Sequence, residues 1–212
     1  MNKGSHISLA VYILERTDGM LNIHKRAFLM GSIIPDCLPS FLTTRHTVTE
    51  TFEIFRMNLS KTICHYHRKK RITAYYCRHL GIIMHYLADY FTFPHNTGYS
   101  GSVKEHIEYE KQLEQELSLH LEKKDLCIKY QNKEDEVDKI CEYILEQHKV
   151  YLALPHDLIT DCNYITELCS TIAMQILAQA SFSQLAHKGE EIQDEPKERK
   201  LEKEEKEKNI AA

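Results

Sequence analysis

Apolar residues recur mostly three and four positions apart along the chain, as in LAVYILERT, VTETFEIFRMNL and ITELCSTIAMQILAQA. This spacing follows one face of an α-helix, whereas the faces of a strand alternate at every residue. Helix breakers are scarce, with 7 glycines and 5 prolines among 212 residues. The pattern therefore predicts an all-α fold made of one multi-helix domain.

The predicted helices span about 6–16, 22–31, 46–58, 62–92, 101–122, 134–151 and 160–186, and the fourth is long enough to be two helices. Breakers stand between them, namely Pro35, Pro39, Pro94, Gly98, Gly101 and Pro155. From Lys188 the chain reads KGEEIQDEPKERKLEKEEKEKN, with almost no apolar residue to bury. We assign residues 1–186 to a helical domain and residues 187–212 to a charged tail, disordered or a frayed helix.

Charge and cysteine content narrow the class of protein. The net charge is −4 and both signs are interspersed, so nothing general indicates a nucleic-acid binder. The seven cysteines form no CxxC pair, which favours reduced and mostly buried thiols. Charged residues interrupt the N-terminal apolar patch before any cleavage site, and no apolar run reaches about 18 residues. We therefore expect no signal peptide and no transmembrane segment, and predict a cytoplasmic protein.

The stretch HYLADYFTFPHN, followed by HIEYE, carries the candidate chemistry. His85 and Asp89 are four residues apart, so they share one face of a helix, and His106 and Glu110 repeat this spacing. One histidine and one aspartate four residues apart more often form a salt-bridged pair than a metal site. An aspartate unpaired inside LGIIMHYLADYFTF would however be costly to bury, and His95 lies close by, just after a proline. Imidazole and carboxylate ligands without thiolates favour zinc, bound between helices in a site with a free coordination position. Manganese and iron are alternatives that the ligand types do not exclude.

These residues resemble the core pattern of the zinc-dependent phospholipase C family, H-x3-D-x5-H followed by H-x3-E/D, whose superfamily includes single-strand nucleases. His85, Asp89, His95, His106 and Glu110 match it in order. Upstream, GSHISLA, GSIIPDCLPS and TTRHTVTETF supply the further matches, which are His6, Asp36 and His46. The resemblance covers roughly residues 1 to 185.

The resemblance implies a cluster of two or three zinc ions. One ion would be held by Asp36, His46, His85 and Asp89, and a second by His95, His106 and Glu110. A third would be held by His6 and a bridging Asp89. In the family the third ion also binds the amine and carbonyl of an N-terminal tryptophan, and this chain has no tryptophan. We expect the Met1 amine to take that position, because the ligand atoms are backbone atoms.

The implied activity is phosphodiester hydrolysis, with Asp36 or Asp89 as catalytic residues that orient the attacking water or accept its proton. The expected substrate is a phospholipid headgroup bond or another phosphodiester, with a peripheral membrane contact as a further expectation and no protein partner. One alternative is a nuclease of the same superfamily, although nucleic acid is the less favoured substrate. Another is a non-catalytic zinc protein, which the histidine and carboxylate ligands argue against because structural sites are usually closed by thiolates.

Other histidines are predicted to be surface or packed residues: His24, His79, His120, His148, His156 and His187. The stretch CHYHRKKR, residues 64 to 71, is interpreted as a solvated basic helix start, because His65 and His67 would point to different faces. If it has a function, that would be to attract a phosphate-bearing substrate or an anionic membrane.

Overall fold

The computed structural model describes residues 1–39, 44–123 and 137–193, and of residues 179–193 only the backbone. Within these residues the chain forms seven α-helices, three short 3₁₀ helices and no strand. The helices are α1 (Lys3–Glu15), η1 (Asn22–His24), α2 (Lys25–Gly31), η2 (Pro35–Cys37), α3 (Val48–Lys69), α4 (Ala74–Tyr90), η4 (Phe93–His95), α5 (Val103–Lys123), α6 (Val137–Leu152) and α7 (Leu158–Gln193). The predicted all-α fold class is confirmed.

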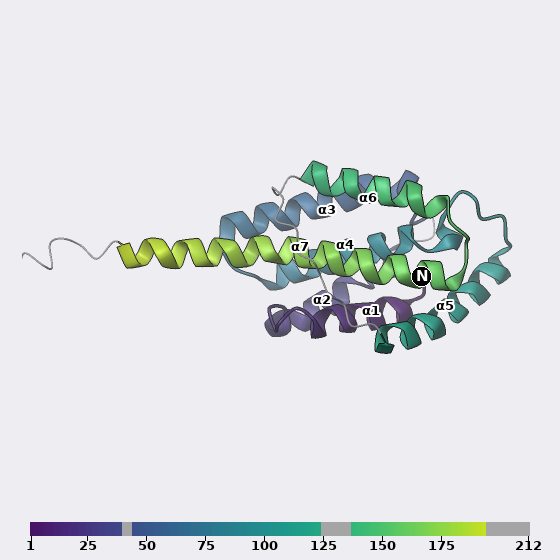
Figure 1. Cartoon of the computed structure of the whole chain (residues 1–212), viewed down its shortest axis with the longest axis horizontal. Helices are drawn as coiled ribbons and strands as arrows, with labels where there is room; N and C mark the ends of the chain where they lie inside the picture. The colour runs from purple at the N-terminus through teal and green to yellow at the C-terminus, as the bar shows by residue number, and fades with distance from the viewer. Residues whose placement is uncertain (40–43, 124–136, 194–212) are drawn as a thin grey trace, which may run out of the picture.

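Helix α4 lies at the centre of the bundle and contacts α1, α2, α3 and α7 (Figure 1). Every residue from Ile83 to Tyr90 is buried, although this segment includes a histidine and an aspartate. In Figure 1, α7 runs along the whole bundle and extends past it at one end. The N-terminus is marked toward the other end, where α7 begins. A helix enclosed on several sides can place polar side chains where water does not reach them.

Two glycines allow α2 and α4 to cross closely. A Cβ atom on Gly31 would lie 2.1 Å from the carbonyl oxygen of Arg78, and one on Gly81 would lie 2.3 Å from that of Phe28. Both distances are too short for any side chain, so the backbones touch at this crossing. The close approach brings the end of α2, and Ser32 just after it, against α4.

The predicted boundary between the third and fourth helices is wrong. The break lies at residues 70–73, inside the predicted helix 62–92, and α3 continues unbroken through residues 59–61. Lys70 ends α3 in the left-handed conformation with φ 52°, and Thr73 caps α4 by accepting a hydrogen bond from the backbone N–H of Tyr76. Lysine seldom takes this conformation, so the residue type did not signal a helix end.

The basic stretch 64–71 is therefore the end of a helix and not its start. His67, Arg68 and Lys69 form the last turn of α3, where positive charge complements the helix dipole. His46 lies two residues before the other end of α3, and a helix of 22 residues is about 33 Å long. The basic stretch and His46 are thus at opposite ends of this helix.

The backbone of α7 remains helical to Gln193, seven residues past the predicted domain end at 186, and residues 194–212 of the predicted tail lie outside the described residues. The division at residue 186 stays a prediction. Four of the six described cysteines are buried, Cys77, Cys141, Cys162 and Cys169, while Cys37 and Cys64 are exposed and Cys127 lies outside the described residues. Of the helices within the described ranges, none combines the length and the apolar character that crossing a membrane requires.

Candidate metal centre

Four side chains from three segments converge beside the C-terminal half of α4. Asp36 comes from η2, His46 from the residues before α3, and His85 with Asp89 from α4. One potential ligand atom of each lies within 4.8 Å of those of the others. The exposed fraction of each side chain is between 0% and 7%. We call these four residues the inner group.

The orientation of His85 is fixed by a backbone carbonyl that the sequence pattern did not reveal. Nδ1 of His85 lies 2.8 Å from the carbonyl oxygen of Ser32, which can only accept a hydrogen bond. Nδ1 therefore carries a proton, and Nε2 is the ring nitrogen directed at the inner group. Nε2 lies 3.2 Å from Oδ2 of Asp89 and 3.5 Å from Oδ1 of Asp36. No side-chain spacing could have indicated Ser32, because the contact depends on the glycine crossing of α2 and α4.

Asp89 is the most connected residue of the region and is fully buried. Its Oδ2 lies 2.9 Å from Nδ1 of His46. Its Oδ1 lies 2.5 Å from the Met1 nitrogen and 3.3 Å from Nε2 of His6. The pKa of the Asp89 carboxyl is held well below its usual range, because the Met1 amine and the neighbouring histidines outweigh the effect of burial.

A second set of three side chains lies next to the inner group. Nε2 of His95 and Nε2 of His106 lie 3.2 Å and 3.1 Å from Oε1 of Glu110. We call these three residues the outer group, because 11%, 34% and 16% of the respective side chains of His95, His106 and Glu110 are exposed. Helix α4 ends at Tyr90, and η4, which contains Pro94, follows it and carries His95 to within 3.2 Å of Glu110 on α5.

The Met1 nitrogen joins the two groups. It lies 2.9 Å from Nε2 of His95 and 3.2 Å from Oε1 of Glu110, in addition to its contact with Asp89. Burial alone would lower the pKa of this amine, but Asp89 and Glu110 outweigh burial and raise it to about 10. Asn2 supports this position by capping α1 through Ser5 and by donating to the side chain of Glu114 at 2.8 Å. All nine predicted ligand residues are thus in one continuous region.

The charges of the region favour a cation. Asp36, Asp89 and Glu110 are three carboxylates, and every ion pair described for them is with a histidine ring or the Met1 nitrogen. Burial lowers the pKa of His6 to about 3 and also lowers that of His95, so these rings are neutral. These carboxylates lie close together in a region withdrawn from water, where a bound cation would offset their charge.

His6 gives an independent sign that the residues fit a metal. Its side chain is 1% exposed, and among the described residues its Nε2 makes no hydrogen bond. Buried polar atoms without a partner are rare in native proteins. The ring stacks on His85 with centroids 3.9 Å apart and points Nε2 toward Oδ1 of Asp89. A buried neutral imidazole whose Nε2 lies 3.3 Å from a carboxylate oxygen, without hydrogen-bond geometry, is suited to metal binding.

A comparison with protein families identifies the chain. The family model described as zinc dependent phospholipase C matches residues 5–158, which include the inner group, the outer group and His6. The chain belongs to the zinc-dependent phospholipase C family. The resemblance stated from the sequence is thereby confirmed, and with it membership of a family of zinc-dependent hydrolases. No curated protein and no solved structure matches the chain.

Three of the histidines that the sequence assigned to other roles make hydrogen-bond contacts outside both groups. Nδ1 of His79 lies 2.7 Å from the side-chain oxygen of Asn58, and Nε2 of His65 lies 2.8 Å from the hydroxyl of Thr73. Nε2 of His148 lies 2.7 Å from the side-chain oxygen of Asn96. These contacts suit packed histidines rather than ligands of the two groups. His187 lies where only the backbone is described.

Proposed function

We propose that the chain is a phosphodiester hydrolase of the phospholipase C type that uses two or three zinc ions. The observation that carries the proposal is the convergence of the inner and outer groups, both of which lie inside the matched family region and are joined through Asp89 and Met1. Ligation by the inner group, by the outer group, and by His6 with Met1 is part of the proposal. Bound zinc would supply Lewis-acid activation of the attacking water and of the phosphoryl group.

Asp36 and Asp89 take different roles in this proposal. Both carboxylate oxygens of Asp89 are engaged, Oδ1 by Met1 and His6 and Oδ2 by His46 and His85, so Asp89 is the bridging ligand. The described contacts of Asp36 with His46 and His85 use its Oδ1 alone, at 3.6 Å and 3.5 Å. Its second oxygen can orient the attacking water and accept its proton.

The partial exposure of the outer group favours a catalytic site over a purely structural one. A metal that only stabilises the fold is usually enclosed by its ligands, whereas a catalytic metal keeps a position open for water or substrate. His106, at 34% exposure, is the most exposed of the nine proposed ligands, and it opens this side of the region to solvent. We place substrate entry at the outer group for this reason.

The substrate class is the finer part of the proposal. A phospholipid headgroup bond is favoured because the family acts as phospholipase C. A nuclease is less favoured, because the basic stretch 64–71, which could attract a nucleic-acid backbone, lies at the far end of α3 from His46. A peripheral membrane contact and a cytoplasmic location stay predictions, the latter testable by cell fractionation.

Hydrolysis of a phosphodiester panel tests the proposal. Zinc-loaded wild type would be assayed on phosphatidylcholine vesicles, a soluble phosphodiester and single-stranded DNA, beside Asp36→Asn and the exposed control His67→Ala. We expect hydrolysis of phosphatidylcholine that Asp36→Asn abolishes and His67→Ala retains. Cleavage of DNA alone would select the nuclease, and zinc binding without hydrolysis of any substrate would select the non-catalytic alternative.

The Met1 nitrogen can be tested separately. A variant with additional residues before Met1 would remove the free amine from its place beside Asp89 and His95. We expect it to lose one zinc ion when metal content is measured by mass spectrometry. Retention of all the zinc bound by the wild type would exclude the amine as a ligand.

A further inference from the structure

Asp161 is a buried carboxylate that belongs to neither group. It lies in the first turn of α7 and its side chain is 0% exposed. Its Oδ2 accepts hydrogen bonds from the backbone N–H of Phe93 at 2.9 Å and from the hydroxyl of Tyr109 at 2.8 Å. Its Oδ1 accepts from the hydroxyl of Tyr151 at 2.7 Å. The sequence pattern gave no reason to single out this residue.

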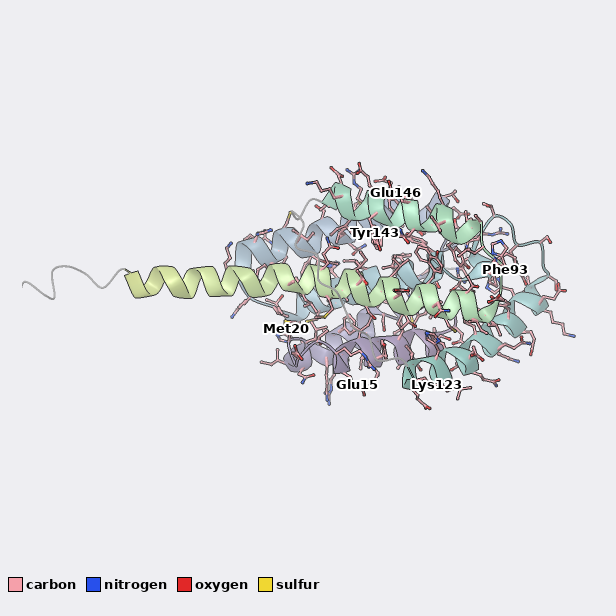
Figure 2. The ribbon with its side chains drawn as sticks, in the orientation of Figure 1. Glu15, Met20, Phe93, Lys123, Tyr143 and Glu146 are labelled. Atoms are coloured by element: carbon pink, nitrogen blue, oxygen red, sulfur yellow. The ribbon has the colours of Figure 1, made fainter. Side chains whose placement is uncertain are left out.

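The donors to Oδ2 stand beside ligands of the outer group. Phe93 begins η4, which His95 ends, and Tyr109 directly precedes Glu110 on α5. One oxygen atom of Asp161 therefore ties together the two segments that carry the outer group. In Figure 2, Phe93 is labelled at the end of the bundle where α7 begins and where η4 and the start of α5 lie.

The contacts around Asp161 bind η4 to the helices in other ways as well. The ring of His156, in the turn before α7, stacks on Phe93 with centroids 4.3 Å apart, and Tyr109 packs edge-on against Phe93 at 6.2 Å. The N-terminal turn of α7 is itself held by Asp157, which accepts from the backbone N–H of Thr160 at 2.7 Å. Asp161 is thus held in place at the start of α7, and its hydrogen bonds can hold η4 and α5 in a fixed relative position.

We propose that Asp161 is a positioning residue that aligns His95 with Glu110 and so sets the zinc affinity of the outer group. As part of the proposed function, the inference assumes that the outer group binds zinc. Hydrogen-bonded groups outside the ligand set typically change metal affinity by about 10–100-fold when removed. The inner group draws its ligands from η2, α4 and the residues before α3, and none of these segments carries a donor to Asp161.

Two tyrosines provide a matched pair for the test. Tyr109→Phe and Tyr151→Phe each remove one hydroxyl that donates to Asp161, but Tyr109 adjoins a ligand on α5 whereas Tyr151 lies on α6, which carries no residue of either group. If Asp161 acts only on stability, both changes should alter the zinc affinity of the outer group equally. If Asp161 positions the ligands, Tyr109→Phe should weaken that affinity and Tyr151→Phe should hardly change it.

Zinc titration of the metal-free protein by calorimetry measures the effect, with His106→Ala identifying which binding event belongs to the outer group. We expect Asp161→Ala and Tyr109→Phe to weaken that event by about 10–100-fold and to leave the inner event unchanged. Tyr151→Phe should stay within about twofold. Asp161→Asn should retain most of the affinity, because its amide oxygen can still accept from Phe93 and Tyr109 while the amide nitrogen donates to Tyr151.

Equal effects of the two tyrosine changes, or wild-type outer affinity in Asp161→Ala, would overturn the proposal. If Asp161→Ala does not fold, the two tyrosine variants decide. Histidine ¹⁵N spectra of the zinc-free protein separate this proposal from the proposed function. Asp161→Ala and Tyr109→Phe should shift the His95 and His106 signals and not those of His46 and His85, whether or not the wild type binds zinc. Unchanged His95 and His106 signals would also overturn it.

Discussion

The inner and outer groups use the same kinds of side chain in different settings. Side chains of the inner group are at most 7% exposed and surround the most buried part of α4, whereas up to 34% of a side chain is exposed in the outer group. The inner group is built where several helices meet, and the outer group on a short turn and the start of one helix. Burial gives the inner group fixed geometry, and exposure gives the outer group access to water and substrate. In the proposed function, the inner group therefore anchors the centre and the outer group is the side at which substrate would enter.

Asp89→Asn should have the largest effect, because Asp89 contacts the inner histidines, His6 and Met1 and so supports both groups. We expect zinc affinity and hydrolysis to fall by more than about 100-fold, since removing groups that merely hold ligands in place has effects of about 10–100-fold. Calorimetry and the phosphodiester assay measure the two losses. Asp138→Asn is the control, because Asp138 is an exposed residue paired with Arg56 and should behave as wild type.

His85→Ala and His106→Ala should separate the groups by folding stability. His85 is fully buried and donates to Ser32, so its loss should lower the free energy of unfolding of the metal-free protein by about 2–3 kcal/mol. His106 is 34% exposed, so its loss should change that free energy by no more than about 0.5 kcal/mol. Each variant should lose one zinc ion. Equal destabilisation, measured by urea unfolding, would contradict the assignment of the inner group to the core.

Gly81→Ala should weaken zinc binding by the inner group although Gly81 is not one of its residues. The added Cβ would lie 2.3 Å from the carbonyl oxygen of Phe28 and 2.8 Å from the nitrogen of Ser32, which would push Ser32 away from His85. We expect about 1–3 kcal/mol of destabilisation and weaker inner zinc binding, with the outer group unchanged. Gly98→Ala is the matched control, because a Cβ there meets nothing within 4 Å. If Gly81→Ala lost zinc from the outer group alone, the proposed link from the glycine crossing through Ser32 to the inner group would be contradicted.

The smallest expected difference between the two groups is in the rate at which a chelator removes their zinc. Because the outer side chains are more exposed, we expect a chelator to remove zinc from the outer group first and from the inner group more slowly. Histidine NMR signals followed during dialysis against a chelator would report the order. Simultaneous release, or earlier change at His46 and His85, would count against two groups of different accessibility.

The sequence was sufficient for the fold class, for the family and for bringing the candidate ligands to attention. Spacing alone could link His85 with Asp89 and His106 with Glu110, because residues four apart in a helix share a face. Pro94 likewise indicated a turn that would direct His95 toward the next helix. These features are local, so the pattern of residues contains them.

The remaining features depend on contacts between distant segments. Lys70 ends α3 in a conformation that its residue type does not favour, so the helix boundary was misplaced and the basic stretch was assigned to the wrong end of a helix. The carbonyl of Ser32 meets His85 only because α2 and α4 touch at two glycines. Asp161 lies 68 residues from Phe93 along the chain. Neither contact follows from a periodic pattern.

The zinc content of the folded protein tests the central claim most directly. Native mass spectrometry of the zinc-loaded wild type should show two or three zinc ions per chain, with one fewer in His106→Ala and the wild-type number in His67→Ala. A wild-type protein that is folded and carries no bound zinc would contradict the account, because both groups would then be networks of histidines and carboxylates without a metal.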